Sequence, residues 1–339
     1  MVSIKDVAAR CGVSAATVSK ALNDHSDISE ATKASVRAAA EALGYHPNSV
    51  ARALKTNRTY NLGVVYDAGS SLGLSHEYFS RVLDSFKQTA EASGYDVTFI
   101  NRNLGGRATS YLEHCHYRGV DGVCVVCTAD FHDPQIRELI ESDIPAVTID
   151  YSFHGRTSII SDNVGGMEEL VRYAFEKGHR RLAFIHGERT DVTENRLASF
   201  YRTCDALGLQ VPEGNVLEAV YHDPRSTAHR TRELLALRER PTCIFFPDDF
   251  SFVGGMNVLQ ESGLSIPEDI SCIGYDGIYL SQVLVPKLTT FRQDTASLGS
   301  RAARCLLEEI EHPKTWIPER ILVKGCLLEG KSVRQLQNT

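Results

Sequence analysis

From residue 61 onward, short apolar segments alternate with amphipathic segments of helical length. The expected strands cover residues 62–66, 96–100, 122–127 and 146–149, and in a second series 182–186, 216–219, 243–246 and 271–275. The expected helices include residues 78–92, 111–117, 134–142, 163–177, 195–207 and 252–262. Because parallel neighbours need a crossover helix, this alternation predicts two doubly wound parallel sheets, an α/β body of two lobes.

Aspartates follow several of the expected strands within one or two residues. These residues are Asp67, Asp150, Asp248 and Asp276. Ligands of open α/β sheets bind beyond the carboxyl ends of the strands, so the four carboxylates are candidates for ligand binding. Asp is also a common cap of the following helix, and capping stays open as the alternative for each of them.

The first 46 residues have a different pattern, with three short helices and no strand. Ser3 can cap a helix with the apolar stripe Ile4, Val7, Ala8 and Cys11, and Asp6 completes a start that resembles a capping box. Gly12 ends that helix, and Ser14 caps a second one over residues 15–22. A third follows from Ser29 to Gly44. Two short helices joined by a turn containing Gly predict a helix-turn-helix, although a small bundle without a DNA role has the same pattern.

Charge favours DNA binding over the inert bundle. Residues 1–58 contain eight Lys/Arg and five Asp/Glu, a net charge of +3. The remaining residues contain 28 Lys/Arg and 38 Asp/Glu, a net charge of −10. The outer face of the second helix is small and has no acidic residue, and residues 46–58 contain three cations and no acid. A cationic end can contact phosphates while the acidic body is repelled by them.

Two long segments, Ile4 to Asn23 and Leu43 to Leu54, closely resemble the N-terminus of the lactose/galactose repressor (LacI/GalR) family of bacterial transcription regulators. The likeness extends through essentially the whole chain. It implies a helix-turn-helix DNA-binding head followed by a two-lobed core like that of periplasmic binding proteins. The expected domains are the head at 1–46, a hinge helix and linker at 47–60, a first lobe of 61–160 plus 293–320, and a second lobe of 161–292 plus 321–332.

The resemblance implies DNA contacts from the second helix, namely Ser14, Ala15, Ala16, Thr17, Ser19, Lys20 and Asn23. Ala15 and Ala16 take the two base-reading positions, and their methyl groups suit thymine methyls. Lys20 stands where the family usually has Arg. Because Lys lacks the planar fork of Arg, we expect a less stringent reading of that base pair.

The hinge segment is expected to lie in the minor groove. The contacts implied there are Asn48, Ala51, Arg52, Leu54 and Lys55. Leu54 corresponds to the family's apolar wedge, which levers apart a central base step; an ordinary core leucine is the alternative.

The resemblance also implies an effector site in the cleft between the lobes. Its expected residues are Tyr78, Phe79, Asp150, Arg196, Asp248, Phe250 and Asp276. Arg196 matches the family's ligand-gripping arginine and Asp276 its paired acid. Carboxylates, aromatic rings and one arginine suit a polyhydroxylated sugar or a sugar phosphate. The segment 68–76 is longer and richer in Gly and Ser than the family's usual loop.

The nine cysteines have no framework spacing and are typical of reduced thiols in a cytoplasm. Cys124 and Cys127 spell C-x-x-C within an expected strand, where positions three apart point to opposite faces. We therefore expect neither a metal site nor a redox pair, and no cofactor.

Two other classes of protein compete with a DNA-binding regulator. A periplasmic sugar-binding protein would need an export signal and would have no helix-turn-helix. An enzyme on a doubly wound fold is the other class, and the glycine pairs Gly165-Gly166 and Gly254-Gly255 lack the GxGxxG pattern of dinucleotide-binding enzymes. The sequence therefore predicts a cytoplasmic repressor of carbohydrate-utilisation genes that binds a palindromic operator as a homodimer, under control of a small-molecule effector.

Overall fold

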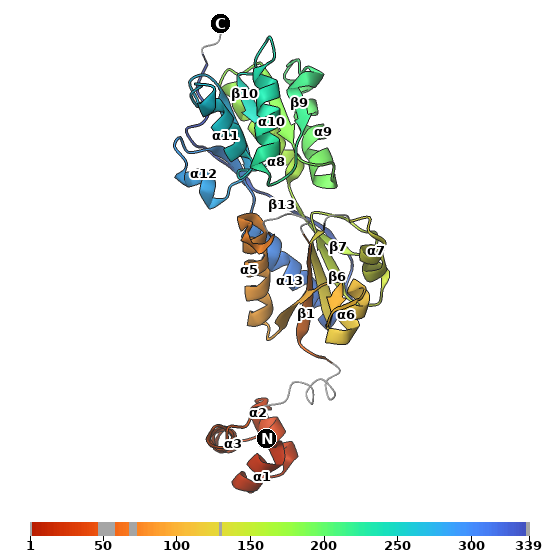
Figure 1. The fold of residues 1–339 in the computed structure, drawn as a ribbon. Helices are drawn as coiled ribbons and strands as arrows, with labels where there is room; N and C mark the ends of the chain where they lie inside the picture. Colours follow the sequence, from red (N-terminus) through yellow and green to blue (C-terminus); the bar gives the residue numbers. More distant parts are fainter. Residues whose placement is uncertain (1, 47–57, 68–72, 129–130, 337–339) are drawn as a thin grey trace. The chain divides into compact units, whose positions relative to one another are not determined.

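The computed structural model describes residues 2–46, 58–67, 73–128 and 131–336 (Figure 1). They belong to two compact units, Met1–Tyr60 and Asn61–Thr339, each with its own hydrophobic core. None of the described helices is long and apolar enough to cross a bilayer.

The first unit contains three helices, α1 (Ile4–Cys11), α2 (Ala15–Leu22) and α3 (Glu30–Leu43). Each of them contributes a fully buried valine to the shared core: Val7, Val18 and Val36. Gly12 and Gly44 end α1 and α3 with φ of 66° and 64°, a left-handed conformation that costs glycine little. The predicted helix-turn-helix is therefore confirmed as a folded unit.

The second unit contains two sheets, each covered by helices, which we call the first and second lobes. In the first lobe the strand order is β13-β7-β6-β5-β1-β2, with every pair parallel. The strands are β1 (Asn61–Asp67), β2 (Asp96–Ile100), β5 (Gly122–Thr128), β6 (Ala146–Ile149), β7 (Thr157–Ser161) and β13 (Arg320–Val323). The helices are α5 (Glu77–Ala92), α6 (Tyr111–Arg118), α7 (Pro134–Glu141) and α13 (Thr295–Glu311). A short turn η1 (Gly73–Ser75) and a hairpin of β3 (Asn103–Leu104) and β4 (Arg107–Ala108) complete this lobe.

In the second lobe the strand order is β14-β12-β11-β10-β8-β9, and only β14 is antiparallel to its neighbour. The strands are β8 (Leu182–His186), β9 (Val216–Glu218), β10 (Cys243–Phe245), β11 (Ser271–Asp276), β12 (Thr289–Arg292) and β14 (Cys326–Leu328). The helices are α8 (Asn163–Glu176), α9 (Asp191–Ala206), α10 (Pro224–Leu235), α11 (Phe252–Glu261) and α12 (Tyr279–Val283), with a turn η2 (Glu213–Asn215).

Alternation along β8 explains why this sheet is covered on both faces. Leu182 and Phe184 belong to the core that α8 and α9 cover, whereas Ala183 and Ile185 belong to the core under α10 and α11. A strand buried on both faces must be apolar throughout, as the sequence of β8 is. The expected fold of two doubly wound sheets is confirmed.

Two boundaries differ from the sequence-based expectation. The third passage between lobes was expected near residue 321, but residues 320–323 form β13, which pairs with β7 in the first lobe. The chain therefore enters the second lobe only after Val323. Helix α9 begins at Asp191, four residues before the expected start, because the Thr190 hydroxyl accepts a hydrogen bond from the Thr193 N–H. Arg196 consequently lies in the second turn of the helix.

The spacing argument for Cys124 and Cys127 was wrong. Their partners on β1 are Val64 and Tyr66, two residues apart, because Val126 is an extra residue that shifts the register. The two cysteines therefore share one face of the sheet. Both are free thiols, and burial raises the pKa of Cys127 to about 12.

Candidate DNA-binding head and interlobe site

The predicted base-reading helix α2 is held at its start by its own side chains. The Ser14 hydroxyl accepts a hydrogen bond from the Thr17 N–H at 3.0 Å and contacts the Thr17 hydroxyl at 2.9 Å. Ala16 is exposed, whereas Ala15 is half-buried and packs against the core of the head. Of the two alanines, Ala16 thus presents more of its methyl group at the surface.

The C-terminal half of α2 carries the other predicted contacts, Ser19, Lys20 and Asn23. The Asn23 amide donates to the Ser19 carbonyl at 2.7 Å and closes the helix end. Lys20 forms an ion pair with Asp27, and the two side chains are 44% and 53% exposed. Exposed pairs of this kind contribute little, so Lys20 can exchange Asp27 for a nucleic-acid acceptor at low cost. The predicted hinge contacts Asn48, Ala51, Arg52, Leu54 and Lys55 lie outside the described residues.

Tyr78 and Asp150 meet in the first lobe. Tyr78 lies in the first turn of α5, and Asp150 follows β6 with φ of 60°. The Tyr78 hydroxyl donates to one carboxylate oxygen of Asp150 at 2.8 Å, and the Ser161 N–H donates to the other at 2.8 Å. Burial raises the pKa of Asp150, while these hydrogen bonds and the charge of Arg196 oppose the rise.

Arg196 is buried in the second lobe with 4% of its surface exposed. Its Nε donates to the Asn163 side-chain oxygen at 2.8 Å, and its Nη1 donates to the Pro247 carbonyl at 3.1 Å. Its guanidinium carbon lies 3.5 Å from the centre of the Tyr275 ring, a cation–π contact. Two hydrogen bonds and a ring hold the guanidinium in one orientation.

Asp276 ends β11 with φ of 101°, and the Gln293 amide donates to it at 2.7 Å. Burial raises its pKa to about 6 even though the charge of Arg196 opposes the rise. Among the described residues, Asp276 and Arg196 form no direct ion pair. In the part of the chain that the structure describes, the side-chain oxygen of Gln293, whose amide donates to Asp276, is buried without a hydrogen-bond partner. The Tyr275 hydroxyl also lacks a partner there, but it lies in the core against Gly166 and Phe291. An orphaned polar atom beside a buried carboxylate is typical of a site that a polar ligand completes.

Asp248 caps the turn that precedes α11, whose own N-cap residue is Ser251. Its carboxylate accepts hydrogen bonds from the N–H and hydroxyl of Ser251, both at 2.7 Å, and from the His222 N–H at 3.1 Å. Burial alone would raise the pKa of Asp248, but the charge of His222 and these hydrogen bonds lower it below its usual range. Phe250, the next predicted aromatic, is half-buried.

Phe79 lies at the contact between the lobes. Its ring centre is 5.5 Å from that of Tyr66 in the first lobe and 6.1 Å from that of His222 in the second. Close by, the Glu77 carboxylate accepts the Tyr279 N–H with both oxygens, each at 2.9 Å. These contacts link the start of α5 to the second lobe.

A cavity of about 330 Å³ adjoins the predicted residues. Tyr78 from the first lobe and Asp276 and Gln293 from the second are among its lining residues. The structure thus brings Tyr78, Asp150, Arg196 and Asp276 close enough for their charges to affect one another. Asp248 forms an ion pair with His222, and the charges of both also act on Asp276.

Sequence reasoning missed several members of this region. Asn163, Tyr275 and Gln293 support Arg196 and Asp276, and Asp249, next to Asp248, is buried and accepts hydrogen bonds from Thr290 and Ile278. Asp249 was detectable because it too follows an expected strand. His76 and His222 were not, since they stand 146 positions apart and neither lies in a motif.

Two protein-family models match the chain. The one described as bacterial regulatory proteins, lacI family, matches residues 3–48, and the periplasmic binding protein-like domain matches residues 171–333. The HTH-type transcriptional repressor PurR of Mannheimia succiniciproducens is 32% identical over 342 residues, which cover 99% of this chain and 100% of the relative. PurR of Pectobacterium carotovorum is 33% identical over 340 residues, with 98% and 97% covered.

The chain belongs to the lacI family of bacterial regulatory proteins. Solved structures agree with this assignment. The lac repressor dimer bound to operator and the anti-inducer ONPF has a TM-score of 0.82 at 27% identity, covering 98% of this chain and 99% of the repressor chain. The complex of the transcriptional regulator CelR with cellobiose has a TM-score of 0.70 at 25% identity, covering 98% and 100%.

Membership of the lacI family makes this chain a DNA-binding transcription regulator rather than an enzyme. The lacI-family model spans the described α1, α2 and α3. The individual DNA and effector contacts in this lacI-family protein stay predictions.

The raised pKa of Asp276 gives this lacI-family protein a pH-dependent stability. Its pKa of about 6 exceeds the value of 3.8 expected in the unfolded chain, so the folded state binds more protons between these values. The free energy of unfolding therefore falls as pH rises through that window. We expect Asp276→Asn to stabilise the protein at pH 8 by about 1–3 kcal/mol, because a neutral amide is cheaper to bury than a carboxylate.

Thermal denaturation of the wild type and of Asp276→Asn at pH 5 and pH 8 measures this effect. The melting temperature of the variant should be higher at pH 8, and the difference should shrink at pH 5, where most of the Asp276 carboxyl is protonated. The same difference at both pH values would show that another group titrates. Asp269→Asn, at an exposed position of the second lobe, is the matched control.

Proposed function

We propose that this lacI-family regulator represses carbohydrate-utilisation genes by binding a palindromic operator as a homodimer. A sugar or sugar phosphate, held between the lobes, controls that binding. The lac repressor compared above is a dimer bound to operator, and the likeness covers 98% of this chain. This supports the same assembly here, with Ser14, Ala16, Thr17 and Lys20 at the DNA.

The observation that carries the effector proposal is the buried charged cluster of Asp150, Arg196 and Asp276. Burying three charges is costly unless each is paired or used by a ligand. Arg196 and Asp276 are not paired with each other, and the Gln293 side-chain oxygen beside Asp276 lacks a partner among the described residues. Carboxylates and hydrogen-bonding side chains with aromatic rings match the hydroxyl groups and the C–H faces of a sugar.

The effector acts by changing how the lobes close. Tyr78 and Asp150 belong to the first lobe and Arg196 and Asp276 to the second, so one ligand that contacts both pairs favours one arrangement of the lobes. It shifts the equilibrium only by its differential affinity for the two arrangements. A change in lobe arrangement alters the spacing of the two chains' hinge segments, and with it the operator affinity.

Nuclease protection on genomic DNA tests the proposed operator binding. The full-length protein should protect inverted repeats whose half-sites lie about one helical turn apart, because a two-fold dimer presents two heads. The affinity should fall steeply as the salt concentration rises. If no inverted repeat is protected, with or without metabolite extract, the proposed operator binding is wrong.

Thermal-shift screening tests the effector class separately. We expect a sugar or sugar phosphate to raise the melting temperature and to change operator affinity. A panel of nucleobases and amino acids serves as the comparison. Stabilisation by one of these, and by no sugar, would reject carbohydrate as the effector class while leaving the operator proposal intact.

A further inference from the structure

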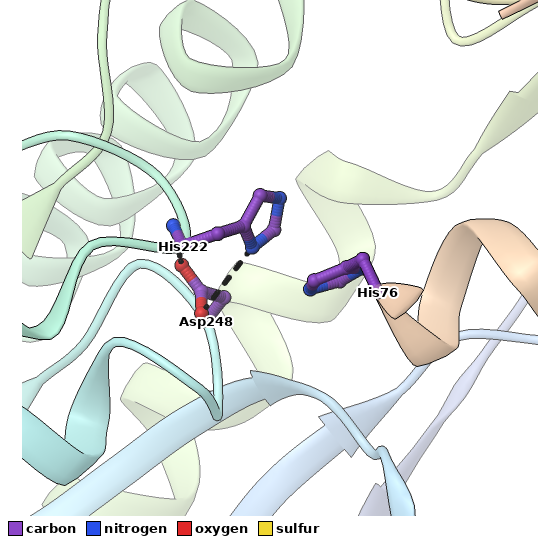
Figure 2. Close-up of side chains that lie close together, drawn as sticks. All are labelled: His76, His222 and Asp248. Carbon is purple, nitrogen blue, oxygen red and sulfur yellow. Dashed lines mark hydrogen bonds and ion pairs between the residues drawn. The ribbon is translucent and has the colours of Figure 1, made fainter. Parts of the chain in front are cut away.

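His76, His222 and Asp248 gather at the contact between the lobes (Figure 2). His76 is the N-cap residue of α5 in the first lobe. His222 lies between β9 and α10, and Asp248 follows β10, both in the second lobe. One nitrogen from each ring and one carboxylate oxygen all lie within 4.8 Å of one another.

The two imidazole rings are buried without the hydrogen bonds that burial normally requires. His76 is 3% exposed, and among the described residues neither of its ring nitrogens has a hydrogen-bond partner. The same is true of Nδ1 of His222, which lies 3.5 Å from the Asp248 carboxylate, too far for a good hydrogen bond. The two unpartnered nitrogens of His76, beside a His222 Nδ1 that has only the 3.5 Å ion pair with Asp248, indicate a missing partner that accepts electron pairs.

We propose that His76, His222 and Asp248 form a binding site for a divalent transition-metal ion, with zinc the best match. Two imidazoles and one carboxylate with a fourth position open is a donor set typical of zinc. Calcium and magnesium prefer oxygen ligands only, so a site with two nitrogens disfavours them. The fourth position is available to water or to a donor atom of a ligand between the lobes.

The geometry needs only a small adjustment. Bonds of about 2.0–2.2 Å in a tetrahedral arrangement place the donor atoms roughly 3.4 Å apart. The pair of His222 and Asp248 already lies at 3.5 Å. Asp248 is fixed by Ser251 and by the backbone N–H of His222. Because all three donor atoms lie within 4.8 Å of one another, the His76 ring has to approach by at most about 1.4 Å. Its ring centre is already 3.7 Å from that of His222.

The ion joins one lobe to the other. His76 supplies a ligand from the first lobe and the other two ligands come from the second, so only the closed arrangement offers all three. Zinc therefore favours closure by the difference between its affinities for the closed and open arrangements. This property does not depend on which effector the Arg196 cluster takes, nor on the operator sequence.

Calorimetric titration of the full-length protein with ZnCl₂, after removal of bound metal with EDTA, tests the site. We expect one ion per chain and a raised melting temperature. His76→Ala should weaken zinc binding by roughly 100-fold, because one of three ligands is lost. His154→Ala, at an exposed histidine of the same lobe, is the matched control and should bind as the wild type does.

Cobalt(II) in place of zinc identifies the ligands. The proposal predicts the intense visible absorption of tetrahedral cobalt without a thiolate-to-cobalt band. A thiolate band that disappears in Cys326→Ser would assign binding to the exposed cysteine and overturn the proposal. So would wild-type zinc affinity in His76→Ala, or no zinc binding by the wild type. If His76→Ala does not fold, His222→Gln provides the same comparison. A sugar-induced shift measured in EDTA separates failure of this site from failure of the proposed function.

Discussion

Full-length protein carrying Val18→Asp is expected to lose specific operator binding by more than roughly 100-fold while its core stays folded. Val18 is fully buried at the centre of the head, where it packs with the valines of α1 and α3. An unpaired carboxylate there costs several kcal/mol, and a head of about 45 residues has little stability to lose. Because the head is a compact unit of its own, the cost falls on that unit.

Gel-shift titration with the operator found by nuclease protection measures the loss, and calorimetric melting shows whether the core transition is kept. The matched control is Ala38→Asp, which adds the same charge at an exposed position of α3. It separates unfolding of the head from simple repulsion of phosphate. Equal losses in the two variants would mean that charge, not packing, explains the result.

Arg196→Ala is expected to abolish the response to effector while leaving operator binding measurable. A charge-assisted hydrogen bond of this kind contributes about 2–3 kcal/mol, so effector affinity should fall roughly 30- to 150-fold. The buried guanidinium is also pre-organised by Asn163, Pro247 and Tyr275, which makes it hard to replace. Arg196→Lys keeps the charge but not the fork and should give a smaller loss.

Calorimetry with the sugar found by thermal shift decides this prediction. Arg202→Ala lies on the same helix with its side chain 66% exposed, and it should bind the sugar as the wild type does. The melting temperature of Arg196→Ala must be measured in parallel, because the change leaves two buried acceptors without a donor. Wild-type affinity in a folded Arg196→Ala would place the effector site elsewhere.

Local sequence signals determined the head almost completely. Ser3, Gly12, Ser14 and Gly44 act within one or two turns of their own positions, through hydrogen bonds and backbone conformations that need no distant partner. The alternation of strands and helices likewise determined the two-sheet core, because a strand that is apolar throughout must be covered on both faces.

Strand pairing was decided only in three dimensions. β13 pairs with β7 although 158 residues separate Ser161 from Arg320, and the extra residue Val126 moves Cys127 onto the face of Cys124. Neither result follows from the residues of one segment, since register depends on the neighbouring strand.

The residues of the site also divide into those that the sequence predicted and those that only the folded structure brings together. The sequence predicted Asp150 and Asp276 because each follows an expected strand. It predicted Arg196 because the surrounding segment resembles the family's. It anticipated no metal site, since His76, His222 and Asp248 come from three separate segments and two lobes. Whether a histidine keeps a free lone pair depends on burial and on the groups around it, and both are properties of the folded chain.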